Sequence, residues 1–155
     1  MAAVKEWRCG RFVFSLNRPL LMGVVNATPD SFSDGGRFCG ADAAVARGLK
    51  LCEDGADIID VGGESTRPGA AETDIETEKK RALPVIEELA KRGAAVSADT
   101  RKPEIMRAAL DCGASVLNDI CGFCAPEALS VAAKSDCGLV AMHMQGAPQT
   151  MQTAP

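Results

Sequence analysis

The segment LLMGVVNATPDSFSDGG, residues 20–36, decides the fold because an uninterrupted apolar run passes directly into a long polar loop. A near-continuous apolar run is typical of a parallel strand that is covered on both faces. Most loops after such a strand contain only a few residues. This loop is longer and is rich in hydroxyl, carboxylate and glycine residues, so we expect a functional site at this end of the sheet.

The same unit of apolar strand, polar or glycine-rich loop and amphipathic helix recurs along the chain. The predicted strands are residues 20–26, 56–62, 94–99, 115–120 and 139–144. The predicted helices are residues 41–55, 73–93, 102–113 and 125–138, and residues 8–19 are expected to form a short hairpin before the first strand. Pro84 is expected to kink the second helix or to split it in two. Strand–helix alternation predicts an α/β fold with a parallel sheet.

Composition indicates one ordinary globular domain over residues 1–155, with 46% hydrophobic and 25% charged residues. The formal net charge of −4 argues against a general nucleic-acid surface. No apolar run approaches the roughly 18 residues of a membrane span, and the first residues lack the apolar region of a secretory signal. Seven cysteines without an export signal favour reduced thiols, so we expect a cytoplasmic location.

Polar residues follow the first two predicted strands where each one ends. Asn26 is suited to bind a hard cation or a phosphate oxygen, although an Asn that caps a turn is an equally good interpretation. The second strand ends at Gly62-Gly63, where the backbone can approach a ligand closely. Ser65, Thr66 and Arg67 then offer hydroxyls and a guanidinium suited to phosphate, although a solvated loop with one ion-paired Arg is the alternative.

The third and fourth strands end in VSADT, residues 96–100, and VLNDI, residues 116–120. Asp99 either caps the following helix or pairs with a heterocycle that has adjacent N–H groups. Asn118 has both a donor and an acceptor for the edge of a ring. Because side chains alternate along a strand, Asn118 and Asp119 should point to opposite faces.

Two further features have weaker functional interpretations. Cys121 and Cys124 form a CxxC pair, but a zinc site would need a second pair and a thioredoxin context is missing. His143 is the only histidine and lies in an apolar stretch, where a core or supporting role is more common. We therefore assign neither feature to the site.

Five motifs in this order resemble those of the bacterial dihydropteroate synthases. The motifs are MGVVNATPDSFSDGG (22–36), IIDVGGESTRPGA (58–70), SADTRKPE (97–104), LNDICGF (117–123) and AMHMQGAPQTMQ (141–152). The resemblance implies a TIM (β/α)₈ barrel, represented here by about five strands. It also implies Mg²⁺ as cofactor, sulfonamides as inhibitors, and homodimers for the full-length family members. The implied reaction joins 6-hydroxymethyl-7,8-dihydropterin pyrophosphate to p-aminobenzoate, giving 7,8-dihydropteroate and pyrophosphate.

The resemblance also implies roles for individual residues. Asn26 would meet the metal and the pyrophosphate, and Arg67 with Thr66 would stabilise the departing pyrophosphate. Asp99 and Asn118 would bind the pterin ring. The loops 28–36 and 65–70 would close over p-aminobenzoate and include Thr28, Pro29, Ser65 and Pro68.

The chain departs from the family pattern in three ways. Ala98 replaces a usual Val, and Arg101 stands where the family often has a small or aromatic residue. A (β/α)₈ barrel needs about 250 residues, and the family's later segments, which supply a second pterin-binding Asp, a Lys, an Arg and a His, are absent from these 155 residues. We therefore expect a truncated chain that is inactive and marginally stable alone.

Two other functions remain open from the sequence. A pterin-binding methyltransferase of the same superfamily would keep the strand-end Asp and Asn, but it has no use for the TPDSFSDGG and STRPGA loops. A non-catalytic pterin-binding module would fold and bind the pterin without turnover.

Overall fold

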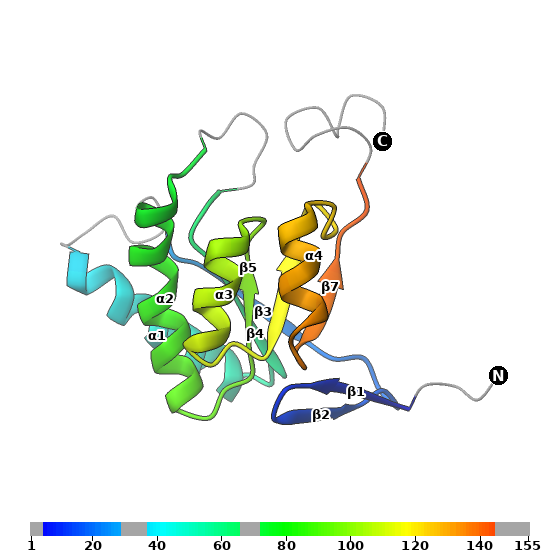
Figure 1. Cartoon of the computed structure of the whole chain (residues 1–155). Coiled ribbons are helices and arrows are strands. Elements are labelled where there is room, and N and C mark those ends of the chain that lie inside the picture. The colour runs from blue at the N-terminus through cyan, green and yellow to red at the C-terminus, as the bar shows by residue number, and fades with distance from the viewer. Residues whose placement is uncertain (1–4, 29–36, 66–71, 145–155) are drawn as a thin grey trace.

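A sheet of five parallel strands forms the centre of the chain (Figure 1). The computed structural model describes residues 5–28, 37–65 and 72–144, with the backbone alone for residues 37–39. The strands are β3 (Met22–Asn26), β4 (Ile58–Gly62), β5 (Val96–Asp99), β6 (Val116–Asp119) and β7 (Gly138–Ala141), and they lie side by side in this order. All five predicted strands are therefore present, although β7 begins one residue earlier than predicted and ends at Ala141.

In the described ranges, four helices connect the strands and lie together on one face of the sheet (Figure 1). They are α1 (Arg37–Glu53), α2 (Ile75–Lys91), α3 (Pro103–Asp111) and α4 (Pro126–Ala133). Consecutive strands with all their helices on a single face are typical of a singly wound α/β barrel. A doubly wound sheet would have helices on both faces.

Helix α2 runs unbroken through Pro84, so the structure excludes the predicted alternative of a split helix. A proline inside a helix removes one backbone hydrogen bond and costs about 3 kcal/mol. The buried face of α2, which includes Val85, Ile86 and Leu89, offsets this cost by packing on the sheet. Asp74 also caps the helix, because its side chain accepts a hydrogen bond from Thr77 N at 2.9 Å.

The two faces of the sheet have different coverings. On the helical face, Val25, Val61, Ala98 and Leu117 are buried against the helices in the main hydrophobic core. On the inner face, an N-terminal hairpin of β1 (Glu6–Cys9) and β2 (Phe12–Ser15) covers one end of the sheet. Side chains of this hairpin pack on Ile58, Ala95, Val116 and Val140.

The hairpin therefore confirms the predicted N-terminal arm and explains its position. It closes the amino end of the inner face, at the lower end of the sheet in Figure 1, and leaves the carboxyl ends of the strands open. None of the helices in the described ranges has both the length and the apolarity to cross a membrane. Cys9, Cys52, Cys112, Cys121, Cys124 and Cys137 are free thiols.

Gly138 lies where the hairpin packs closely against β7, so a larger residue at this position should destabilise the fold. A Cβ atom added here would overlap Cys9 Sγ and would lie 2.7 Å from Trp7 Cζ2. We expect Gly138→Ala to lower the free energy of unfolding by about 1–3 kcal/mol, as is typical of overpacking. Urea denaturation measures this change. Gly40→Ala is the control, because a Cβ at Gly40 has no atom within 4 Å among the described residues, and equal stability of the two variants would contradict the prediction.

Candidate functional site

One row of residues crosses the carboxyl end of the sheet. In the strand register Asn26 lies beside Gly62, Gly62 beside Asp99, and Asp99 beside Asn118. Residues in one row of a parallel sheet point to the same face, here the inner face that the helices leave uncovered. The structure thus brings together the three polar strand-end residues that the sequence singled out.

Asp99 is the acid of this row, and its pKa is strongly raised. It is half-buried, and burial raises its pKa to about 7, with a further contribution from the neighbouring carboxylates of Asp60, Glu78, Asp119 and Glu64. Asp99 does not cap α3, because the N-cap of that helix is Lys102 and has no side-chain capping bond. Asp99 therefore titrates near neutral pH at the open end of the sheet, which is a property typical of functional carboxylates.

Gly62 makes room for the Asp99 carboxylate. A Cβ atom on Gly62 would lie only 3.2 Å from Asp99 Oδ2, and one on Gly63 would lie 3.0 Å from the backbone oxygen of Glu78. The sequence suggested that these glycines allow a ligand to approach. The structure gives a reason inside the chain itself, which is close packing of β4 against its neighbours.

We predict that Gly62→Ala displaces Asp99. The carboxylate would move away from the sheet, where solvation favours its ionised form, so its pKa should fall by about one pH unit or more. A ¹³C NMR titration of the Asp99 carboxyl carbon measures this value. Gly40→Ala serves again as control, and an unchanged Asp99 titration in Gly62→Ala would show that the glycine has no such role.

Asp60 lies next to this row, toward the amino end of β4, and was not singled out from the sequence. It is 4% exposed and lies two residues before Gly62 on the same face. Asn118 Nδ2 donates a hydrogen bond to Asp60 Oδ2 at 3.2 Å. Burial raises the pKa of Asp60, while the nearby hydroxyl of Ser97 and the hydrogen bond from Asn118 act in the opposite direction. The sequence does contain a signal that could have identified Asp60, because it is a polar residue inside an otherwise apolar strand.

Asp119 points away from Asn118, as the alternation along β6 predicted. Its carboxylate is buried and accepts hydrogen bonds from Cys121 N and Phe123 N, both at 2.8 Å. These bonds hold the turn after β6, in which Phe123 has a φ of 58°. Asp119 thus supports the loop that contains the CxxC pair.

A buried ion pair joins the β5–α3 connection to α2. Lys102 Nζ lies 2.6 Å from Glu78 Oε2, and Thr100 Oγ1 donates to Glu78 Oε1 at 2.6 Å. The Lys102 ammonium also donates to Thr73 O at 2.6 Å and lies 3.2 Å from Glu64 Oε1. Glu78 is fully buried, and these partners satisfy both of its carboxylate oxygens.

Arg101 extends this network at the surface. Its guanidinium lies 2.8 Å from Glu72 Oε1 and 3.3 Å from Glu64 Oε2. Glu64 and Glu72 lie on either side of residues 66–71, so Arg101 links the chain before and after that segment. The family departure at Arg101 therefore has a structural consequence, which the sequence did not reveal.

The remaining predicted residues lie at or beyond the edges of the described ranges. Thr28 is half-buried and Ser65 is exposed. Pro29, Thr66, Arg67 and Pro68 lie outside the described residues. Of the predicted set, the structure therefore places Asn26, Thr28, Ser65, Asp99 and Asn118.

Asn26 is the predicted metal ligand. It is exposed at the end of β3 and its side chain makes no hydrogen bond to another described residue. In the described ranges no group of three or more His, Cys, Asp or Glu side chains is placed to hold a metal ion. A single amide oxygen fits Mg²⁺, which is commonly bound by few protein groups together with waters and substrate phosphates.

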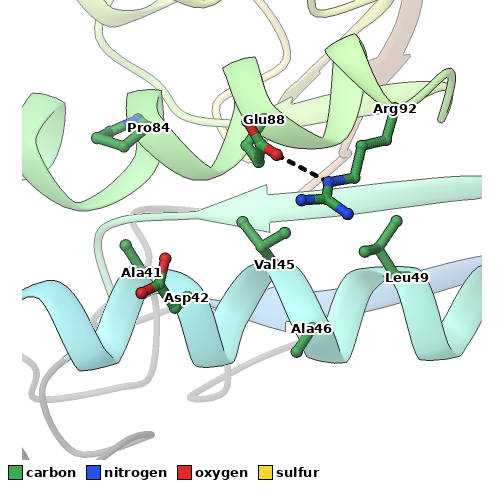
Figure 2. A pocket seen from close by; sticks show the side chains of 8 residues that line it. All are labelled: Ala41, Asp42, Val45, Ala46, Leu49, Pro84, Glu88 and Arg92. Carbon is green, nitrogen blue, oxygen red and sulfur yellow. Dashed lines mark hydrogen bonds and ion pairs between the residues drawn. The ribbon is translucent and has the colours of Figure 1, made fainter.

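A separate cavity of about 520 Å³ lies between α1 and α2 (Figure 2). One end contains an ion pair in which Arg92 Nε lies 2.8 Å from Glu88 Oε1. The lining residues are Ala41, Asp42, Val45, Ala46, Leu49, Pro84, Glu88 and Arg92. Because α1 and α2 cover the helical face, this cavity is not part of the polar row.

Comparison with known proteins adds to this geometry. Residues 22–155 match the family model described as "Pterin binding enzyme". The dihydropteroate synthase of Escherichia coli K12 is 49% identical over 141 residues, which are 90% of this chain and 50% of that protein. The dihydropteroate synthase of Neisseria meningitidis serogroup B is 45% identical over 152 residues, which are 96% of this chain and 53% of that protein. The chain thus spans about half the length of the curated relatives it matches.

Solved structures give the same similarity. The Xanthomonas albilineans dihydropteroate synthase with 4-aminobenzoic acid has a TM-score of 0.87 at 48% identity, over 92% of this chain and 52% of that one. The Yersinia pestis dihydropteroate synthase in a sulfonamide complex has a TM-score of 0.86 at 42% identity. The match covers 97% of this chain and 55% of that one. These neighbours are TIM barrels, so the five strands correspond to part of a barrel, as predicted.

Proposed function

The chain belongs to the family of pterin-binding enzymes, and from this premise we propose that it supplies part of the active site of a dihydropteroate synthase. The proposed reaction joins 6-hydroxymethyl-7,8-dihydropterin pyrophosphate to p-aminobenzoate. The bond between the pterin methylene carbon and the pyrophosphate oxygen breaks, and the electron pair leaves with pyrophosphate. The amine nitrogen bonds to that carbon and releases a proton. The row of Asn26, Asp99 and Asn118 is the observation that supports this proposal most directly.

Asp99 and Asn118 are the proposed pterin-binding residues. An ionised Asp99 can accept hydrogen bonds from two adjacent N–H groups of a ring, and charge-assisted bonds of this kind are the stronger ones. Its pKa of about 7 means that the carboxylate is available above neutral pH. Asn118, beside it in the register, offers a further contact to the same ring.

Asn26, Thr66 and Arg67 are the proposed pyrophosphate-binding residues. The Arg67 guanidinium matches phosphate geometry and would stabilise negative charge on the departing group. Asn26 would hold Mg²⁺ together with the pyrophosphate. When bound, the metal would neutralise charge on the pyrophosphate oxygens.

The p-aminobenzoate site is proposed to involve Thr28, Pro29, Ser65 and Pro68. Thr28 and Ser65 lie in the loops that follow the carboxyl ends of β3 and β4, the end of the sheet that contains the polar row. Sulfonamides would compete at this site. We also propose a cytoplasmic location and a homodimeric whole protein, which rest on the similarity to the synthases and, for the location, on the free thiols.

Two measurements test the proposal. Calorimetric titration of the chain with 6-hydroxymethyl-7,8-dihydropterin pyrophosphate and Mg²⁺ should give saturable binding, which Asn118→Ala should weaken about tenfold or more. Glu127→Gln, an exposed change on α4, is the control. The second measurement fuses this chain to the unmatched half of the Escherichia coli synthase and detects 7,8-dihydropteroate by mass spectrometry.

The outcomes separate the candidate functions. Binding together with product formation by the fusion supports the synthase. Binding without product in the fusion favours a non-catalytic pterin-binding module. Absence of binding by both proteins would contradict the proposal.

A further inference from the structure

Asp60 and Asn118 form a hydrogen bond across the inner face of the sheet. They lie on β4 and β6, so the bond between Asn118 Nδ2 and Asp60 Oδ2 passes over β5, which lies between these strands. Asp60 is 4% exposed. In the described part of the chain, its other oxygen, Oδ1, and the buried Ser97 Oγ have no hydrogen-bond partner within 3.5 Å.

This bond decides the orientation of the Asn118 amide. An ionised carboxylate only accepts hydrogen bonds, whereas the two ends of an amide differ, one being a donor and the other an acceptor. The Asn118 nitrogen must therefore face Asp60, and the amide oxygen is left for another partner. Without the carboxylate, the two orientations of the amide would become closer in energy.

We propose that Asp60 is a positioning residue for ligand binding, which holds Asn118 so that its Oδ1 is presented as an acceptor beside Asp99. This inference rests on the proposed function, since it concerns the same ring-binding residues. Two neighbouring acceptors select a ring edge that has hydrogen-bond donors at both positions. In this proposal Asp60 acts through Asn118, to which it is hydrogen-bonded, and not by its own contact with the ring.

A double-mutant cycle separates this role from a structural one. The probe is 6-hydroxymethyl-7,8-dihydropterin, titrated by calorimetry at pH 8, because burial raises the pKa of Asp60 and the carboxylate must be ionised. Asp60→Asn and Asn118→Ala should each weaken binding about tenfold. In the Asn118→Ala background, Asp60→Asn should have no further effect, because a residue that acts through Asn118 has nothing left to position.

Asp57→Asn is the matched control. It makes the same chemical change one residue before the amino end of β4, where Asp57 is paired with Arg18. Its effect on pterin affinity should be less than twofold. Additive losses from Asp60→Asn and Asn118→Ala, or wild-type affinity of Asp60→Asn, would overturn the proposal.

A second measurement needs no variant and no ligand. The side-chain amide ¹H and ¹⁵N resonances of Asn118 in the wild-type chain should shift with pH in parallel with the carboxyl carbon of Asp60. Failure of the Asn118 resonances to follow Asp60 would overturn the positioning role even where Asp60→Asn does not fold. Failure of the wild-type chain and of the synthase fusion to bind any pterin would instead contradict the proposed function.

Discussion

Asp99→Asn should greatly weaken pterin binding and, at pH 8, make the folded chain more stable. Asparagine has the shape of aspartate but cannot accept hydrogen bonds from two N–H groups as a carboxylate does, so the affinity should fall at least about 100-fold. The increase in stability follows from the same carboxylate. Burial and four neighbouring acids raise its pKa to about 7, so the folded state opposes its ionisation.

The sign of the pH dependence follows from the difference in bound protons. Between about pH 4 and pH 7 the folded state keeps the proton on Asp99 longer than the unfolded state does, so this group lowers the free energy of unfolding as pH rises. Asp99→Asn removes this pH-dependent loss of stability, because asparagine does not ionise. We expect a gain of about 1–2 kcal/mol at pH 8, allowing for the partial exposure of the side chain, and little gain at pH 4.

Urea denaturation at the two pH values, together with calorimetric titration of the pterin, measures both effects. Asp57→Asn is the control, because Asp57 is paired with Arg18 and its pKa is lowered rather than raised, mainly by the Arg18 hydrogen bond. Asp57→Asn should therefore not stabilise the chain at pH 8. Equal stabilities of wild type and Asp99→Asn at pH 8 would refute the buried-acid explanation, and unchanged affinity would refute the binding role.

Lys102→Met should cause the largest loss of stability. It leaves the fully buried Glu78 without its cation, 2.6 Å away in the wild type. Removing one partner of a buried ion pair typically costs 3–5 kcal/mol. We expect a decrease of about this size in the free energy of unfolding, because Thr73 O and Glu64 also lose the ammonium.

Two further variants test the cause. Lys102→Met combined with Glu78→Gln should recover part of the loss, because the amide can still accept the hydrogen bond from Thr100 without a buried charge. Lys79→Met removes the same type of side chain from an exposed pair with Glu76 and should change stability by less than about 1 kcal/mol. If Lys79→Met and Lys102→Met were equally destabilising, burial of Glu78 would not be the cause.

The sequence predicted the elements well because their signals are local. Apolar runs and glycine stops located all five strands. The alternation of strands and helices predicted a parallel sheet with its long polar loops at one end. Pro84 was the exception, since a local rule for proline ignores the packing of the α2 face that offsets the lost hydrogen bond. The strand-end residues Asn26, Asp99 and Asn118 were found for the same local reason.

The sequence by itself thus determined the class of fold, the order of the elements, the family and the polar residues at the ends of the strands. Only the tertiary structure decided what surrounds them. Asp60 and Asn118 are 58 residues apart and Glu78 and Lys102 are 24 apart, yet each pair is in contact. A charged residue in a helix is ordinarily assigned to solvent, so nothing local marks Glu78 as buried. The pKa of Asp99 likewise depends on burial and on four acids from other positions, because electrostatic effects follow distance in space and not along the chain.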